Sequence, residues 1–212
     1  MKAVVCLPTR NEAESIQEMI DSIKRLGYDL FIADSNSTDG TQEIARKNKV
    51  EVYQRDGVGK GYGIRKAVEV ASSKGYDVLV LLDCDKTYPP EEIPGMLEFF
   101  PEYDVVLGVR DMKEISFTHR LANIFHTQMI NLFYGGHLHD INTGMRAFKV
   151  EKYKGLLTAK GFDIEAQMSL LALKKKMKIK EIPVRYLKRA GESKIRVSDG
   201  FLIAWRIIRD RF

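Results

Sequence analysis

The chain has 212 residues, of which 44% are hydrophobic and 30% charged, and its net charge is +5. This composition is typical of a soluble globular protein, and no run of 18 apolar residues is present, so we expect no segment to span a membrane. Two cysteines, Cys6 and Cys84, form neither a disulfide framework nor a metal-binding spacing, which favours a reducing cytoplasm. The basic charge leaves nucleic acid, an anionic membrane and phosphorylated small molecules open as partners.

Strands and helices alternate along the first half of the chain. Apolar runs predict strands at 3–7, 30–33, 50–53, 78–82 and 105–108. Apolar residues at helical spacing predict helices over 12–26 and 42–48, and a glycine-rich turn at 57–63 leads into a helix that ends near residue 72. This alternation predicts the α/β class, with a mainly parallel central sheet and helices on both faces.

The second half is less regular. Helices are predicted over 121–133 and 164–175, with irregular or strand segments at 140–148 and 179–187. The stretch 199–212 has an apolar face interleaved with arginines and is predicted as an amphipathic helix. No internal repeat or linker is visible, so we expect a single domain over residues 1–198, followed by that helix.

Two carboxylates, Asp83 and Asp85, follow the apolar run 78–82 directly. Ligands bind at the carboxyl ends of strands in open α/β sheets, and a hard divalent ion that bridges to a phosphate is a natural partner for such a pair. Alternatively, Asp85 caps the helix that follows Pro89 and Pro90. The pair by itself leaves both interpretations open.

Two further polar loops follow predicted strands, at 8–12 and 34–41. Each by itself has the composition of a helix start. Together with the acidic pair, however, they would meet at one edge of the sheet. This convergence favours a ligand site over a set of unrelated caps.

Several motifs in this order resemble the inverting glycosyltransferases of family 2, which have the GT-A fold, a Rossmann-like mixed sheet. The second half resembles the polyprenyl-phosphate glycosyltransferases, notably dolichol-phosphate mannose synthases. The motifs are P-T-R-N-E (8–12), D-S-N-S-T-D-G-T (34–41), G-K-G (59–61), D-C-D-K-T-Y-P-P-E-E (83–92), G-V-R (108–110), D-I-N-T-G-M-R-A-F (140–148), G-F-D-I-E (161–165), E-I-P-V-R-Y (181–186) and G-E-S-K-I (191–195).

The resemblance implies a nucleotide-sugar half at 1–110 and an acceptor half at 111–198. It places Pro8, Arg10, Glu12 and Asp34 in the pocket for the base and ribose of a GDP-mannose or UDP-glucose type of donor. Asp83 and Asp85 would hold Mg²⁺ or Mn²⁺ against the diphosphate, with Asp85 counted as catalytic. Lys60 would add a cation there, and its neighbours Gly59 and Gly61 would allow close backbone approach.

A polyprenyl or dolichyl phosphate acceptor is already largely dianionic near neutral pH, because its second pKa is about 6. It needs cations that bind and aim it rather than a base. Arg110 and Arg146 are the expected catalytic cations, and Glu165, also counted as catalytic, is expected to orient the sugar or a loop. The further binding candidates are Arg120, Thr143, Arg189 and Lys194.

The sequence departs from its relatives after the acidic pair. Thr87 stands where mannose synthases have a glutamine, so the sugar stays open. An acceptor with a sugar or protein hydroxyl is the alternative, and it would require Glu165 or Asp163 as a base. A nucleic-acid-binding module ranks last, because the basic residues are scattered and the acidic clusters would repel phosphates.

Because acceptor lipids lie in membranes, we expect contact with a membrane surface. The stretch 199–212 mixes Phe201 and Trp205 with arginines, which suits an interfacial helix. The protein is therefore predicted to be peripheral on the cytoplasmic face of the membrane, or to use a membrane-anchoring partner subunit.

Overall fold

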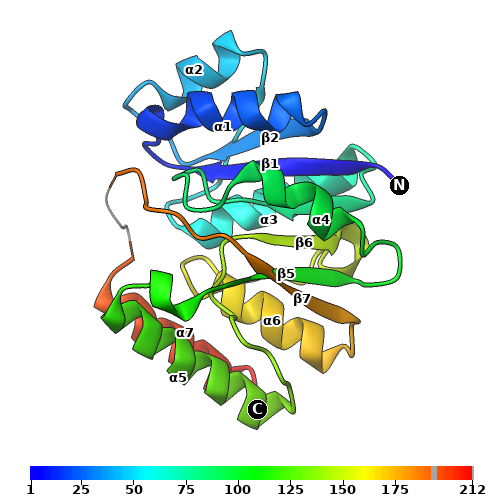
Figure 1. The fold of residues 1–212 in the computed structure, drawn as a ribbon, viewed down its shortest axis with the longest axis vertical. Helices are drawn as coiled ribbons and strands as arrows, with labels where there is room; N and C mark the ends of the chain where they lie inside the picture. Colours follow the sequence, from blue (N-terminus) through cyan, green and yellow to red (C-terminus); the bar gives the residue numbers. More distant parts are fainter. Residues whose placement is uncertain (192–194, 212) are drawn as a thin grey trace.

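The computed structural model describes residues 1–191 and 195–211. In this part of the chain a seven-stranded sheet lies between helices, with strand order β3-β2-β1-β4-β6-β5-β7 (Figure 1). The strands are β1 (Ala3–Thr9), β2 (Asp29–Asp34), β3 (Glu51–Gln54), β4 (Val78–Leu81), β5 (Val105–Arg110), β6 (Arg146–Lys149) and β7 (Ile179–Val184). The α-helices are α1 (Ala13–Arg25), α2 (Thr41–Lys47), α3 (Lys60–Ser73), α4 (Ile93–Leu97), α5 (Phe117–Tyr134), α6 (Ile164–Lys174) and α7 (Val197–Arg209).

The predicted mixed, mainly parallel sheet is confirmed. Strand β6 runs antiparallel to β4 and β5, whereas the other pairings are parallel. Successive residues of β4 point to opposite faces: Leu79 and Leu81 join the core under α3, α5, α6 and α7, and Val78 and Val80 join the core under α1, α2 and α4. Burial on both faces explains why this strand is an unbroken apolar run.

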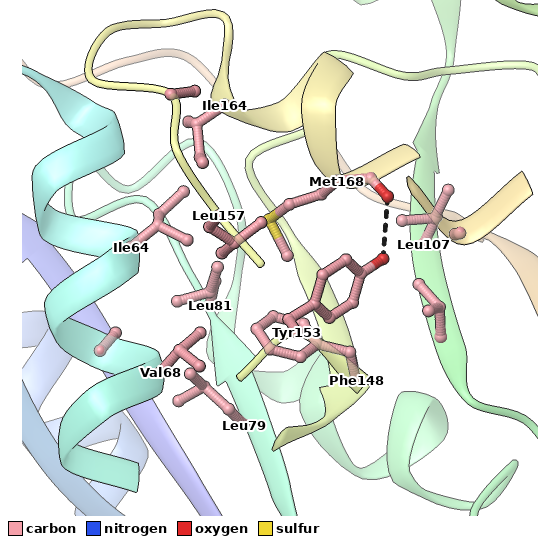
Figure 2. Close-up of a cluster of buried hydrophobic side chains, with 14 of the residues drawn as sticks. Ile64, Val68, Leu79, Leu81, Leu107, Phe148, Tyr153, Leu157, Ile164 and Met168 are labelled. Carbon is pink, nitrogen blue, oxygen red and sulfur yellow. Dashed lines mark hydrogen bonds between the residues drawn. The ribbon is translucent and has the colours of Figure 1, made fainter. Parts of the chain in front are cut away.

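Figure 2 shows the core on the α3 and α6 face, where Val68 of α3 lies near Leu79. The ring of Tyr153 packs edge-on against Phe148, with ring centres 4.8 Å apart. The Tyr153 hydroxyl donates a 3.0 Å hydrogen bond to the Met168 carbonyl, as a buried tyrosine requires. This contact ties the segment after β6 to α6.

Six strands run in the same direction, and their carboxyl ends lie at one edge of the sheet; they are β1, β2, β3, β4, β5 and β7. Because β6 is antiparallel and pairs Arg146 with Leu81, the turn that precedes β6 reaches the same edge. The acidic loop after β4 therefore meets the 140–145 turn from the second half of the chain.

Three predicted helix starts were wrong, and one of them is α5, which begins at Phe117 instead of 121. Helix α3 begins at Lys60, so Gly61 and Gly63 lie inside the helix rather than in the turn. Helix α7 begins at Val197 instead of 199. The division into donor and acceptor halves stays a prediction. In the described part of the chain, no helix is both long enough and apolar enough to cross a bilayer.

His126 lies between α5 and α7, with its Nε2 3.0 Å from the Gly200 carbonyl oxygen. Burial lowers the pKa of this imidazole, and the hydrogen bond to Gly200 opposes that shift in part. The unfolded chain then binds a proton more readily below about pH 6.5, so stability falls as the pH drops through that value and levels off below the folded-state pKa.

We therefore expect the free energy of unfolding to fall below about pH 6.5, by at most about 1.4 kcal/mol per pH unit for this group. In His126→Gln that part of the slope should disappear. Urea unfolding of both proteins between about pH 7.5 and 5 measures it. An identical slope in the two proteins would contradict the assignment.

Candidate active site

The acidic pair lies directly after β4, at the carboxyl edge of the sheet. The Asp83 Oδ1 atom lies 2.7 Å from Nζ of Lys60, and the same Nζ lies 2.5 Å from Oε1 of Glu165. Lys60 begins α3 and Glu165 lies in the first turn of α6, so three elements converge on one ammonium group. The structure thus brings three of the predicted site residues into direct contact.

Burial by itself lowers the pKa of Lys60, but Asp83 and Glu165 raise it above its ordinary value. Lys60 therefore stays charged at neutral pH and provides the cation that buried carboxylates require. The Glu165 side chain is 6% exposed and that of Asp83 is 21% exposed, so Asp83 lies on the open side of this cluster.

Close backbone contacts fix the position of Lys60. A Cβ atom added to Gly59 or Gly61 would lie 2.3 Å from a carbonyl oxygen of the facing segment 159–161. The Gly61 N–H also donates a 3.1 Å hydrogen bond to the Gly161 carbonyl. Close backbone approach at these two glycines was predicted, and the structure shows that the partner is the chain's own segment.

Asp85 pairs with a different cation. Its Oδ2 lies 2.5 Å from Nη1 of Arg189, and its Oδ1 accepts hydrogen bonds from the N–H (3.1 Å) and hydroxyl (2.5 Å) of Thr87. Backbone hydrogen bonds from Leu187 to Thr87 and from Ala190 to Asp85 hold the segment 187–190 along the acidic loop. Asp85 therefore caps no helix, and Thr87 orients its carboxylate.

The turn before β6 lies against Asp83. A Cβ atom on Gly144 would lie 2.0 Å from the Asp83 Oδ2 atom. The Gly144 N–H donates a 2.9 Å hydrogen bond to the Tyr88 hydroxyl, and the buried Thr143 hydroxyl lies 3.4 Å from the same oxygen. Thr143 thus lies next to the acidic loop, in a turn without spare room, and its role in binding stays a prediction.

At the end of β2, Asp34 is fully buried. Its carboxylate accepts hydrogen bonds from the hydroxyls of Thr9 (2.9 Å) and Ser37 (2.6 Å) and from the Gln42 side-chain amide (2.8 Å). This differs from the prediction that Asp34 faces a base or ribose. In the structure the carboxylate instead holds the loop after β2 against the end of β1.

The other predicted donor-pocket residues lie around the end of β1. Pro8 is partly buried in that strand, Arg10 is exposed just after it, and Glu12 precedes α1. The Glu12 N–H donates a 2.8 Å hydrogen bond to the Thr41 hydroxyl, which joins the two polar loops. The predicted convergence of these loops is confirmed, whereas contact with a nucleotide stays a prediction.

Arg110 ends β5 and is fixed by Asp140. Its Nε lies 2.7 Å from Oδ2 and its Nη2 lies 2.8 Å from Oδ1, which is a bidentate pair. The guanidinium carbon lies 5.3 Å from the centre of the Tyr186 ring. The Arg110 side chain is held in one place at the site edge of β5.

Residues 4–157 match the family model described as glycosyl transferase family 2. The chain belongs to this family. It is a glycosyltransferase, as the motifs predicted.

Two of the relatives that this chain is similar to come from Haloferax volcanii. Glycosyltransferase AglJ is 33% identical, over 97% of this chain and 71% of the relative. A dolichyl-phosphate hexose transferase is 32% identical, over 90% of this chain and 85% of the relative.

The fold is shared with glucosyl-3-phosphoglycerate synthase from Mycobacterium tuberculosis. A crystal structure of that protein with Mn²⁺, UDP-glucose and phosphoglyceric acid has a TM-score of 0.78 at 18% identity, over 99% of this chain and 79% of that chain. The predicted GT-A fold is confirmed.

Arg146 of this glycosyltransferase does not lie where the family resemblance implied. Its side chain is 1% exposed and donates hydrogen bonds to the carbonyls of Ile141 (3.1 Å), Thr143 (2.9 Å) and Glu165 (3.2 Å). The expectation of an arginine that contacts phosphate is corrected, because the guanidinium is turned toward the protein's own carbonyls. Arg146 instead ties the turn before β6 to the first turn of α6.

Another predicted cation, Arg120, belongs to a helix outside the acidic loop. Arg120 is on α5, with its guanidinium carbon 5.5 Å from the centre of the Phe117 ring, and within the described ranges it forms no ion pair with Asp83 or Asp85. Lys194 falls outside the described residues.

Arg55 is a buried cation at the site edge that sequence reasoning missed. It follows β3 and donates hydrogen bonds to the carbonyls of Thr9 (2.7 Å) and Gly59 (3.1 Å). Burial lowers the pKa of this guanidinium to about 10, which leaves it charged at neutral pH. Its position at the carboxyl end of a strand was the signal available in the sequence.

The acidic pair fits a divalent ion that arrives with its substrate. Among residues 1–191 and 195–211, no group of three or more His, Cys, Asp or Glu could hold a metal ion. Mg²⁺, however, is commonly bound by one or two carboxylates together with substrate phosphates and water. Asp83 and Asp85 offer this hard oxygen set, and Lys60 and Arg189 balance their charge.

Proposed function

We propose that this glycosyltransferase moves a hexose from a nucleotide sugar to a polyprenyl phosphate such as dolichyl phosphate, in a reaction that depends on Mg²⁺ or Mn²⁺ and inverts the anomeric centre. The Haloferax dolichyl-phosphate hexose transferase, which matches 90% of this chain, supports the acceptor class. The complex of Mn²⁺ and UDP-glucose with the structural neighbour supports the metal and the donor class.

The observation that carries the choice of acceptor is the state of the two candidate bases. Glu165 is paired with Lys60 at 2.5 Å, and Asp163 is paired with Arg206 at 2.7 Å. A hydroxyl acceptor needs a carboxylate that is available to take its proton. A phosphate acceptor is already ionised near neutral pH and needs only cations. The geometry therefore favours phosphate over a sugar or protein hydroxyl.

Each group then has a defined task. Asp83 and Asp85 would hold the divalent ion, which would neutralise charge on the departing nucleoside diphosphate. Lys60 keeps Asp83 in place and adds positive charge beside it. Arg110 and Arg189, which are paired with Asp140 and Asp85, would bind and aim the acceptor phosphate. Attack from the face opposite the diphosphate inverts the configuration.

The test is transfer from GDP-mannose, UDP-glucose or UDP-N-acetylglucosamine to dolichyl phosphate, with and without EDTA. We expect a lipid-linked sugar from one of these donors, its loss with EDTA, and a β-linked product by NMR. Transfer to soluble hydroxyl acceptors, with loss of activity in Glu165→Gln, would instead establish the alternative. No lipid-linked product from any donor would refute the proposal.

Contact with a lipid surface is part of the proposal. Of the twelve large hydrophobic side chains that are exposed in the described residues, five lie on α5 and four on α7. The two helices run side by side in the same direction, because Tyr134 donates a 2.7 Å hydrogen bond to the Ile207 carbonyl and His126 lies beside Gly200 (Figure 1). Their exposed apolar residues are Phe117, Leu121, Ile124, Phe125, Leu132, Phe201, Leu202, Trp205 and Ile208.

This apolar face suits an anionic bilayer on the cytoplasmic side. Helix α5 contains no acidic residue, and Arg196, Arg209 and Arg211 are exposed around α7. Apolar area and attraction to anionic lipid act together in such helices. The two free, buried cysteines agree with a reducing compartment. A membrane-anchoring partner subunit stays a prediction.

We expect Trp205→Glu to reduce binding to vesicles of phosphatidylglycerol and phosphatidylcholine by at least about tenfold, because Trp205 is a large aromatic residue of this face that is 59% exposed. The measurement is co-flotation without any polyprenyl phosphate. Val58→Glu, at a side chain that is 66% exposed outside this face, is the matched control and should float like the wild type. Equal flotation of the two variants would contradict the assignment of the face.

A further inference from the structure

Arg206 lies on the inward side of α7 and is 7% exposed, whereas Arg209 of the same helix is exposed. Its Nε and Nη2 lie 2.8 and 2.7 Å from Oδ2 of Asp163. Its Nη1 lies 3.4 Å from the Thr158 hydroxyl and 3.3 Å from Oδ2 of Asp210. The buried guanidinium thus joins α7 to the segment before α6.

That segment continues toward the active site through hydrogen bonds. The second oxygen of Asp163 accepts the Gly161 N–H at 3.2 Å. The Gly161 carbonyl in turn accepts the Gly61 N–H at 3.1 Å. Two hydrogen bonds therefore connect the Arg206–Asp163 ion pair to Gly61. Gly61 directly follows Lys60, the residue that contacts Asp83.

The packing of this segment leaves little freedom. Segment 159–161 fills the space at Gly59 and Gly61 so closely that neither glycine has room for a Cβ atom. Asp163 also precedes α6, and Glu165 is the second residue of that helix. A displacement of segment 158–163 would therefore act on Lys60 and Glu165 together, and both determine where Asp83 lies.

We propose that Arg206 is a positioning residue of the active site. Through Asp163 it fixes segment 158–163, and this segment sets Lys60 and Glu165 against Asp83. Helix α7 is then part of the scaffold of the donor site, in addition to its exposed apolar face. The inference rests on the donor half of the proposed function and is independent of the acceptor.

The test compares Arg206→Gln, Arg206→Lys, Asp163→Asn and the double variant Arg206→Gln/Asp163→Asn. Arg25→Gln is the matched control, because Arg25 is an exposed arginine at the end of α1 whose hydrogen-bond partner is Ser22. Hydrogen exchange is measured on the proteins without ligands. The Mn²⁺-dependent binding of UDP and GDP is measured by calorimetry. For the donor that proves active, KM and kcat are measured separately.

In Arg206→Gln we expect exchange at residues 59–63 and 158–165 to accelerate at least about tenfold, while β1 and α1 keep the wild-type rate. The KM for the donor should rise about tenfold, with the KM for the acceptor changed less than about twofold. Arg206→Lys should recover part of the loss, and the double variant should lose no more than either single variant, because both substitutions break one contact.

Three results would overturn the inference. The first is a lower melting temperature in Arg206→Gln with unchanged donor KM and unchanged exchange at 59–63, which would restrict Arg206 to packing of α7. The second is additivity in the double variant. The third is an equal effect of Arg25→Gln. If the wild type binds neither nucleotide, the proposed function fails, and the exchange and double-variant data still decide the role of Arg206.

Discussion

Asp85→Asn is expected to lower the rate of sugar transfer by about 100- to 1000-fold, the usual effect of removing one group that stabilises developing charge. The substitution keeps the shape of the side chain but removes its negative charge. In the native site the Arg189 guanidinium faces one carboxylate oxygen and the two Thr87 donors face the other. In the variant the amide N–H₂ would replace one of these oxygens, so a donor would face a donor. Calorimetry should show loss of Mn²⁺-dependent nucleotide binding, with kcat falling in the same variant.

Asp104→Asn is the matched control for this prediction. Asp104 is also a partly buried aspartate in ion pairs, with Lys149 at 3.0 Å and Lys152 at 3.5 Å, but it precedes β5 at the opposite edge of the sheet. Its variant should lose stability and keep its transfer rate. Full activity in Asp85→Asn, or an equal loss in both variants, would refute the metal-site assignment.

The sequence predicted the members of the acidic cluster because their positions follow from strand order. Residues that directly follow parallel strands must meet at one edge, so Asp83, Asp85 and the 34–41 loop could be placed together without coordinates. Glu165 and Arg189 required the family motifs, since they come from the second half of the chain. Backbone hydrogen bonds hold the segments that carry these two residues next to the acidic loop and Gly61. Such backbone contacts leave no pattern of residue types in the sequence.

Arg146 and Asp34 show where motif reasoning fails. A motif names a residue type, but the direction of its side chain depends on register, and register is not visible in a four-residue strand such as β6. Arg146 pairs with Leu81 and Leu107, and from there its guanidinium reaches carbonyls of the preceding turn. Asp34 accepts donors from three segments of the chain, which only the folded loops bring together.

The ion pairs also change the interpretation of the basic residues. Lys60 and Arg189, predicted as ligands of phosphate, each neutralise one carboxylate of the acidic pair in the structure. Two buried or half-buried carboxylates next to each other would otherwise repel. A divalent metal ion would add two positive charges to the site. The diphosphate that binds with it would add negative charges, so the site keeps its charge balance when it is filled.

Gly144→Ala is expected to reduce kcat/KM by about 100-fold, the loss that a displacement of about 1 Å can cause in an active site. The added Cβ atom would lie 2.0 Å from Oδ2 and 2.5 Å from Cγ of Asp83, so the carboxylate must leave its position beside Lys60. The turn itself resists a shift, because the Gly144 N–H is bonded to the buried Tyr88 hydroxyl. Overpacking of this kind also costs about 1–3 kcal/mol of stability, measurable by urea unfolding.

Gly95→Ala separates this effect from a general intolerance of alanine. Gly95 lies within α4, where a Cβ atom would meet nothing within 4 Å, and neither glycine has a positive φ angle. Alanine there should add up to about 1 kcal/mol through helix propensity and leave transfer unchanged. Because backbone strain is absent at both positions, any loss confined to Gly144→Ala must come from the contact with Asp83. Wild-type kinetics in Gly144→Ala would mean that Asp83 can move without consequence and is not held for the metal.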